Sequence, residues 1–490
     1  MGHGPRAAGQ RPDGGRTRKV PSGRRERKPF SDYHSAVPIL RAFRALRYAH
    51  DPGGDLSPVL CPPYDIIGAD RLAALMARDP HNAVRLELPQ PDPGADPATR
   101  YKAAARALSA WRTDKVLVKD RAATITLHEM TFAGPAGGER RALGLFVRLK
   151  LEPFSDGAAT GVRRHERTMT GPKEDRYQLL KATGANLSPV VLLHEADRAG
   201  TRALLDRLTA READAAAATD DGVRHRLWVA TASSGRDAED GAGPAVTPGT
   251  ADADALLALV GTSALTIADG HHRYETALRY REERGRNRAC ESDPAWDHVL
   301  ALLYHVDDAP PVLPTHRALL AGPSGEQLLD ALEGLFDVER LADAPGVLAR
   351  MAADPPAGAP DATGSGRVGL VSGGVAAILS ARPAAFAPLL DESASAASQG
   401  LDVNRVAAAL ERLGVDAEAL AAGDRVRYVK SAAEAVALAV DGGASATLLL
   451  DGPPVTAVTR VAAAGEVMPQ KSTYFDPKAP TGLLFGPLEW

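Results

Sequence analysis

Cysteine is almost absent from this sequence of 490 residues, which has two, Cys61 and Cys290. So few cysteines argue against a disulfide framework and fit a reducing cytoplasm. Long apolar runs are also missing, since none approaches the roughly 18 residues that a transmembrane helix needs. The first residues are polar and basic without an apolar segment, so they do not predict a secretory signal. We therefore expect a cytoplasmic protein without a membrane partner.

The net charge of −4 hides an asymmetry along the chain. Residues 1–28 carry nine Lys and Arg against two acidic residues, or +7, which leaves −4 − 7 = −11 for the remainder. This first segment is rich in Gly and Arg, with few large apolar side chains, so we expect a disordered basic tail over residues 1–29. The acidic body argues against a nucleic-acid-binding protein, and the tail is where any such contact would form.

Helical and extended patterns alternate from Lys28 onward, which predicts a mixed α/β chain of the α+β class. A Gly-containing turn joins strands at 123–132 and 141–151 into a hairpin, and residues 367–382 predict a second hairpin. Helices are expected where apolar residues recur with helical spacing, for example at 69–79, where Asp65 is placed to cap the start. The remaining expected strands lie at 83–88, 187–194, 224–231, 264–270, 298–306, 425–430 and 445–450, and the remaining helices at 96–114, 197–212, 250–262 and 431–440.

The domain organisation follows from changes in composition along the chain. A stretch rich in Pro, Gly and Ala at 352–366 predicts a flexible loop. We place the loop boundary at 346–366, between an N-terminal α/β region at 30–345 and a C-terminal α/β region at 367–490. The same loop is equally compatible with an insertion within one domain.

The stretch "LTIADGHHRYETALRY" (265–280) has the strongest functional signal in the sequence. An apolar strand runs through Asp269 and Gly270 directly into a helix that begins with His271, His272 and Arg273. Cations in the first turn oppose the helix dipole, and a bound anion would reverse that penalty. Gly270 permits a tight turn and a close approach of the ligand. Asp269 is a candidate to cap the helix, to hold Mg²⁺, or to accept a proton from a hydroxyl group.

This turn has two alternatives to an anion site. An ordinary capped helix with solvent-facing histidines would explain any one of these residues. A zinc site is less favoured, because adjacent histidines project to different sides of a helix and lack the spacing that metal-binding helices use.

Two further blocks carry groups suited to phosphate chemistry. In "RRHERTMTGPKEDRYQLL" (163–180), Glu166 is a candidate general base or metal ligand, and Arg164 and Arg167 would balance phosphate charge. In "MPQKSTYF" (468–475), Lys471 and Ser472 suit phosphate or carboxylate binding, while a structural turn is the alternative. Cys61, in "CPPYDII" (61–67), is interpreted as a packed small side chain.

Five blocks together resemble the prokaryotic family of unknown function DUF1015, namely those at 61–67, 163–180, 268–278, 313–319 and 468–485. The turn itself is similar to the glycine-containing boxes of ParB and sulfiredoxin proteins, and above all to the "DGHHR" of ADP-dependent free-serine kinases. That resemblance implies a ParB/sulfiredoxin-like nucleotide-binding core embedded in a larger α/β protein. His271 stands where sulfiredoxins carry a cysteine, and no helix-turn-helix segment of the ParB type is found.

These observations predict a phosphotransferase that uses ADP or ATP with Mg²⁺ and acts on a small hydroxyl metabolite such as serine. Positioning and charge neutralisation are the main requirements of phosphoryl transfer. We expect Asp269, Glu166 and His272 to be catalytic, with Asp269 as the magnesium ligand. Gly270, His271, His272, Arg273, Arg164, Arg167, Lys471 and Ser472 are expected to bind the nucleotide. A nucleotide-binding switch without catalysis and a metal-dependent hydrolase are the alternatives.

Overall fold

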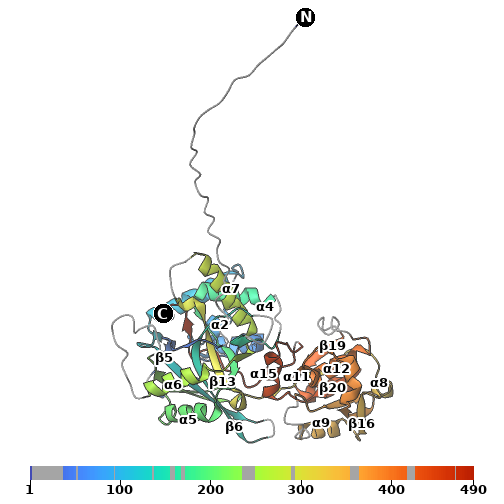
Figure 1. The fold of residues 1–490 in the computed structure, drawn as a ribbon. Coiled ribbons are helices and arrows are strands. Elements are labelled where there is room, and N and C mark those ends of the chain that lie inside the picture. Colours follow the sequence, from blue (N-terminus) through green and yellow to red (C-terminus); the bar gives the residue numbers. More distant parts are fainter. Residues whose placement is uncertain are drawn as a thin grey trace. The chain divides into compact units, whose positions relative to one another are not determined.

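A ten-stranded, mainly antiparallel sheet forms the larger part of the protein, shown in a computed structural model (Figure 1). Its central hairpin is the predicted one, β5 (Thr124–Ala133) and β6 (Glu139–Lys150), paired from Thr126 to Ala133. The strands follow the order β3 (Gly54–Asp55), β10 (Ala215–Ala218), β11 (Arg224–Thr231), β5, β6, β13 (His298–His305), β9 (Val190–His194), β12 (Leu265–Asp269) and β7 (Val162–Arg163), and β1 (Leu40–Arg41) pairs with β6.

A second, six-stranded sheet is built from later parts of the chain. It contains the second predicted hairpin, in which β17 and β18 pair antiparallel. The strand order is β16 (Phe336–Arg340), β18 (Val375–Ala381), β17 (Arg367–Ser372), β20 (Ala446–Leu450), β15 (His316–Leu319) and β19 (Val426–Val429). Three two-stranded pairs complete the β-structure: β2 (Leu46–Tyr48) with β4 (Leu117–Lys119), β8 (Ala185–Asn186) with β22 (Gly486–Pro487), and β14 (Val312–Leu313) with β21 (Tyr474–Phe475).

Helices bury their apolar faces against both sheets. Leucines of α5 and α6 share a core with β9 and β12, and Val347 and Val436 pack in the same way on the six-stranded sheet. The helices are α1 (Ala69–Arg78), α2 (Val84–Glu87), α3 (Thr99–Thr113), α4 (Gly171–Thr183), α5 (Arg198–Leu208), α6 (Thr250–Val260), α7 (His271–Asn287), α8 (Glu326–Leu332), α9 (Ala344–Ala352), α10 (Pro383–Phe386), α11 (Ala396–Gln399), α12 (Asp402–Glu411), α14 (Ala432–Val440) and α15 (Val455–Ala463). The mixed α/β fold class is therefore confirmed.

The structure describes residues 1–2, 37–50, 53–92, 94–134, 137–154, 160–166, 171–233, 249–287, 293–353, 363–415, 425–469 and 471–489. Within residues 35–490 the chain forms one unit by its contacts. The basic tail, Arg167, Cys290 and most of the 352–366 stretch lie outside the described residues. None of the described helices is both long and apolar enough to cross a membrane.

The predicted domain boundaries at 30–345, 346–366 and 367–490 stay predictions. Strands β16 and β17 lie on either side of the 346–366 segment in the sequence, and both belong to the six-stranded sheet. Strand β15 also precedes the segment and pairs with β20 beyond it. The strand pairing therefore favours the alternative that this segment is an insertion within one domain.

The strand predicted at 83–88 is wrong, because residues Val84–Glu87 form the short helix α2. Asn82 starts this turn: its Oδ1 accepts a hydrogen bond from the Val84 N–H, and its Nδ2 donates to the carbonyl oxygens of Pro58 and Leu60. The side-chain contacts of Asn82 with a distant segment therefore override the alternating pattern of residues 83–88, which favours a strand.

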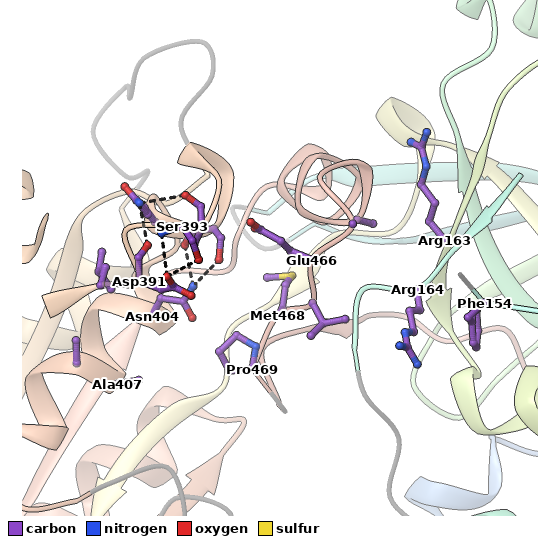
Figure 2. Close-up of a pocket in the computed structure, with 18 of the residues that line it drawn as sticks. Phe154, Arg163, Arg164, Asp391, Ser393, Asn404, Ala407, Glu466, Met468 and Pro469 are labelled. Carbon is purple, nitrogen blue, oxygen red and sulfur yellow. Dashed lines mark hydrogen bonds between the residues drawn. The ribbon is translucent and has the colours of Figure 1, made fainter. Parts of the chain in front are cut away.

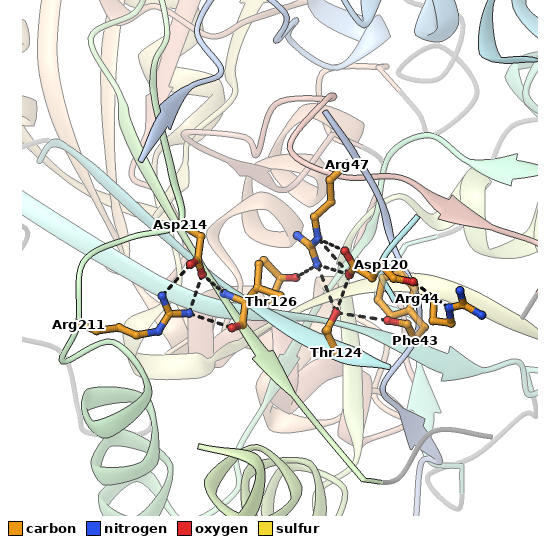
Figure 3. Close-up of polar contacts among 9 residues, drawn as sticks. Phe43, Arg44, Arg47, Asp120, Thr124, Thr126, Arg211 and Asp214 are labelled. Carbon is orange, nitrogen blue, oxygen red and sulfur yellow. Dashed lines mark hydrogen bonds and ion pairs between the residues drawn. The ribbon is translucent and has the colours of Figure 1, made fainter. Parts of the chain in front are cut away.

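A polar cluster ties the β2–β4 pair to strand β5 (Figure 3). Arg47 Nε donates to Asp120 Oδ1 over 2.8 Å, and its Nη2 donates to Thr126 Oγ1 over 2.6 Å. Thr124 Oγ1 donates in turn to Asp120 Oδ2 over 2.8 Å. Because both charged side chains are largely buried, their loss of water is compensated by the ion pair, by the hydrogen bond that Thr124 donates and by the one that Thr126 accepts.

Eight histidines of the described residues are buried. Burial lowers the pKa of His165, His225, His298 and His316 to about 4, and that of His194 to about 3. His128 and His225 stack in the ten-stranded sheet, with His128 Nε2 3.1 Å from His225 Nδ1. These side chains are neutral in the folded protein at neutral pH, whereas in the unfolded chain they bind protons below about pH 6.5.

We therefore predict that the buried histidines make the free energy of unfolding fall as the pH drops from about 6.5 to 4, partly offset by Glu166 and Glu152, whose raised pKa values of about 7 contribute in the opposite direction. The unfolded chain binds the protons there, so each buried histidine lowers stability by about 1.4 kcal/mol per pH unit. Chemical denaturation at pH 7.5, 6.5 and 5.5 measures this slope, and His225→Gln should reduce it by about one histidine's share. His81→Gln, at a partly exposed histidine, is the matched control, and an unfolding free energy independent of pH over this interval contradicts the prediction.

Candidate functional site

The turn between β12 and α7 has the predicted form of strand, glycine and helix. Strand β12 ends at Asp269, Gly270 adopts a left-handed backbone with φ of 91°, and α7 begins at His271. A Cβ atom at Gly270 would lie 2.9 Å from Arg273 Nε. The left-handed backbone conformation therefore favours glycine at this position, and a larger residue would also displace the end of the Arg273 side chain.

Asp269 is held between two cations. Its Oδ2 pairs with Arg273, whose other terminal nitrogen donates to the Pro189 carbonyl oxygen, and its Oδ1 lies 3.1 Å from Lys478 Nζ. Burial acts to raise the pKa of Asp269, but Lys478 and Arg273 outweigh it and hold that pKa at about 2. The ion pairs make Asp269 an anchor for two cations, and they leave it poorly suited to the expected roles of magnesium ligand and helix cap.

Lys478 is one of the residues of this cluster that the sequence analysis missed. It also pairs with Asp65, with Lys478 Nζ 2.7 Å from Asp65 Oδ2. Asp65 therefore does not cap α1 as expected: the residue before that helix is Gly68, which has no capping side chain. Burial lowers the pKa of Lys478, but Asp269 and Asp65 outweigh it and raise that pKa above its ordinary value.

Two histidines from separate blocks meet beneath the turn. The rings of His165 and His271 lie 4.7 Å apart, nearly perpendicular. His165 Nδ1 contacts the Ile267 carbonyl oxygen at 2.5 Å, and its Nε2 contacts Thr473 Oγ1 at 2.8 Å. Burial lowers the pKa of His271 well below its ordinary value, and its Nε2 is buried with no hydrogen-bond partner in the described part of the chain.

The first turn of α7 therefore carries less charge than expected. His271 is neutral at neutral pH, and burial, followed by Lys173, lowers the pKa of the half-buried His272 as well. Arg273 is the remaining cation, and it is paired with Asp269. His271 is buried whereas His272 is partly exposed, so the two adjacent histidines do lie on different sides of the helix.

Glu166 and Lys471 meet beside this turn. Burial raises the pKa of Glu166 to about 7, although the Lys471 charge and backbone N–H act to lower it. Lys471 has a left-handed backbone with φ of 61° and an exposed side chain. The buried Ser472 donates its hydroxyl hydrogen to the Pro469 carbonyl oxygen over 2.5 Å, so this hydroxyl closes a structural turn.

A third lysine comes from the six-stranded sheet. Lys430, directly after β19, places its Nζ 3.6 Å from the centre of the Tyr474 ring, and Lys478 Nζ lies 5.4 Å from the same ring. Neither Lys430 nor Lys471 forms an ion pair with a described residue. Burial and the charges of Lys478 and Lys471 lower the pKa of Lys430, so the three lysines influence one another.

The other predicted residues are distributed around this cluster. Arg164 lies 5.2 Å from the Phe154 ring centre, on a larger cavity next to Glu166, while Arg167 falls outside the described residues. No group of three His, Cys, Asp or Glu side chains that could hold a metal ion occurs among the described residues. The donor set beside Asp269 thus does not fit a magnesium ion held by protein ligands.

Comparisons with known proteins give one family match. A family model described as a protein of unknown function (DUF1015) matches residues 40–404, or 365 of 490 positions. No curated protein matches the chain.

Three similar solved structures share little sequence with this chain. Free serine kinase in complex with AMP is 12% identical over 64% of this chain and 83% of that one, with a TM-score of 0.29. A mutant of free serine kinase in complex with ADP is 11% identical, with the same coverage and TM-score. A conserved hypothetical protein from Pyrococcus furiosus is 11% identical over 64% and 86%, with a TM-score of 0.27. Scores this low carry no argument about activity, and the ParB/sulfiredoxin-like core stays a prediction.

The paired charges at the turn give a stability prediction. We expect Asp269→Asn to lower the free energy of unfolding by about 3 kcal/mol at pH 7.5, because two largely buried cations lose their partner. Lys478→Met should lower the free energy of unfolding by less in the Asp269→Asn background than in the wild type. Chemical denaturation of the two single variants and the double variant should give a coupling energy of at least about 1 kcal/mol. The control Glu434→Gln removes the exposed pair with Arg427 and should cost less than about 1 kcal/mol. Additive losses from Asp269→Asn and Lys478→Met would contradict this account.

Proposed function

The chain belongs to the DUF1015 family, and we propose that it is a nucleotide-dependent phosphotransferase acting on a hydroxyl compound. The observation that carries the proposal is the position of Glu166, a carboxyl group with a pKa of about 7 next to Lys471. A general base is most effective when its pKa lies near the operating pH. Lysines beside such a base are suited to neutralise the charge of transferred phosphate.

Lys471, Lys430 and Lys478 are the proposed phosphate contacts. The first two are exposed and have no ion pair with a described residue, so their charges are available to a ligand. The cavity beside Asp269, Arg273 and Lys478 holds about 20 Å³, room for no more than a water molecule. The phosphates would therefore lie on the exposed side of the cluster, next to the start of α7, where backbone N–H groups favour anions.

The proposed reaction moves one phosphoryl group. Glu166 takes the proton of the acceptor hydroxyl, whose oxygen forms a bond to the terminal phosphorus of the nucleotide. The bond from that phosphorus to its bridging oxygen breaks, and the electron pair leaves with the shortened nucleotide. Lys471 and Lys430 stabilise the charge on the phosphoryl oxygens during this step.

Asp269 acts as a positioning residue in this proposal, because it holds Lys478 and Arg273 in place. His272, partly exposed in the first turn of α7, is the candidate donor to a phosphate oxygen, with Gly270 allowing the nucleotide to approach. Mg²⁺ enters with the nucleotide, and no protein ligand is assigned to it. ADP and ATP are both candidate phosphoryl donors.

Nucleotide binding is the first prediction of this proposal. We expect the protein to bind ADP or ATP in the presence of Mg²⁺, and Lys471→Ala to weaken binding about tenfold, because it removes one charge-assisted hydrogen bond. Isothermal titration calorimetry measures both affinities. Lys181→Ala, which removes an exposed pair with Glu283, is the control and should bind as the wild type does. Absence of binding by either nucleotide would overturn the phosphotransferase and the nucleotide-switch readings together.

Turnover depends on Glu166 in this account. Glu166→Gln should lower kcat by roughly 10²–10⁴-fold, because an amide cannot accept the proton, while nucleotide affinity stays near the wild-type value. The carboxylate is present above its pKa of about 7 and is lost below it, so kcat should fall as the pH drops through about 7. Nucleotide consumption with a panel of hydroxyl acceptors gives the rates. Binding without turnover for every acceptor in the panel would favour the switch over the enzyme.

A further inference from the structure

A large cavity is lined by residues that lie close in the sequence to the proposed catalytic cluster: Arg164 precedes Glu166 by two positions, and Pro469 precedes Lys471 by two. Its volume is about 750 Å³, and it is lined by residues around Phe154 and β7 on one side and by α11, α12 and the segment at 389–394 on the other (Figure 2). Ala462 and residues 465–469 line it as well, and the N–H of Met468 donates to the His165 carbonyl oxygen over 2.7 Å. A volume of this size is typical of cavities that bind ligands well beyond three carbon atoms.

One wall of the cavity is basic. Arg164 lies 5.2 Å from the Phe154 ring centre and forms no ion pair with a described residue, while Arg163 lies beside it on β7. Stacking on the ring restricts the Arg164 guanidinium group and leaves its donors for another partner. A half-buried guanidinium group with available donors suits one carboxylate or phosphate group of a ligand.

The opposite wall offers hydrogen-bond acceptors. Gln399 Nε2 donates to the carbonyl oxygens of Asp391 and Ala394, each over 3.1 Å, and Asn404 Nδ2 donates to the Ser398 carbonyl oxygen over 2.7 Å. These contacts fix the orientation of both amide groups, because a flipped amide would place an oxygen against a carbonyl oxygen. The amide oxygens of Gln399 and Asn404 accept no hydrogen bond from described residues, so acceptors are what this wall leaves for a ligand.

Carboxylates strengthen the acceptor character of this wall. Asp391 Oδ1 accepts from the N–H and the hydroxyl of Ser393, which leaves Oδ2 without a donor among described residues. Glu411 and Glu466 also line the cavity. Three carboxylates against two arginines give the lining a formal charge of −1, which disfavours a polyphosphate, so any anionic group of a ligand is expected at the basic wall.

We propose that this cavity binds a polyhydroxylated small molecule with a single anionic group, of the class of sugar phosphates and sugar acids. Its carboxylate or phosphate contacts Arg164, and its hydroxyl groups donate to the amide oxygens of Gln399 and Asn404 and to Asp391. Arg164, on the wall of the cavity, lies two residues before Glu166, so we assign this ligand as the phosphoryl acceptor. This assignment rests on the proposed function, whereas binding of the ligand class to the cavity does not. It replaces a serine-sized acceptor with a larger one.

Isothermal titration calorimetry of the full chain without nucleotide tests the proposal. The complete probes are glucose 6-phosphate and gluconate, which carry both hydroxyl groups and an anionic group. Glucose, with hydroxyl groups alone, and inorganic phosphate, with the anionic group alone, are the partial probes. We expect one of the two complete probes to bind at least tenfold more tightly than glucose or inorganic phosphate. Tighter binding of glucose 6-phosphate identifies phosphate as the anionic group of the ligand, and tighter binding of gluconate identifies carboxylate. Arg164→Leu should weaken that binding at least tenfold, and Ala407→Phe, within the cavity on α12, should abolish it.

Two exposed positions supply matched controls, Arg412→Leu and Ala433→Phe, which should bind as the wild type does. Binding by neither complete probe would overturn the proposed ligand class, as would equal affinity for inorganic phosphate and glucose 6-phosphate. If a complete probe binds while ADP and ATP do not, the phosphotransferase proposal fails and the cavity assignment stands.

Discussion

The ion pair between Asp269 and Lys478 joins the parts of the chain on which the proposed site depends. Lys478 draws the C-terminal segment against the β12–α7 turn, and its second partner, Asp65, ties in the block at 61–67. Buried opposite charges of this kind compensate one another's loss of water and fix the relative position of their chain segments, although their net contribution to the free energy of unfolding is modest. On the same C-terminal segment, Lys471 lies beside Glu166 and Thr473 contacts His165.

Burial and neighbouring charges give the carboxyl groups beside the β12–α7 turn very different pKa values. Asp269 keeps its charge to low pH because two cations flank it, whereas Glu166 is desolvated and shares one lysine, so its pKa lies near neutrality. Two carboxylates with such different pKa values can take separate roles, one structural and one in proton transfer. The neutral histidines His165 and His271 fill the space beneath the turn without adding charge.

The sequence predicted local structure well where periodicity was strong. The hairpin of β5 and β6, the strand and helix around Gly270, and α5 and α6 lie where apolar spacing placed them. The prediction failed at 83–88, where hydrogen bonds from Asn82 to a distant segment decide the conformation. It also assigned Asp65 to a local cap, although its partner lies at the other end of the chain.

The candidate site was predictable from the sequence only in part. Asp269, Gly270 and Glu166 stood out because their residue types are unusual beside an apolar strand or within a loop. Lys478 and Lys430 gave no such signal, since lysines are common in any sequence and only the tertiary fold brings these two to Tyr474. The charge state of His271 was also beyond the sequence, because it depends on burial against His165.

The central claim is that the fold gives Glu166 the pKa of a general base. A ¹³C NMR titration of the glutamate side-chain carboxyl carbons, with the Glu166 signal assigned by its absence in Glu166→Gln, measures this directly. The account predicts a midpoint at about pH 7. A midpoint near the ordinary glutamate value of about 4.3 would contradict it.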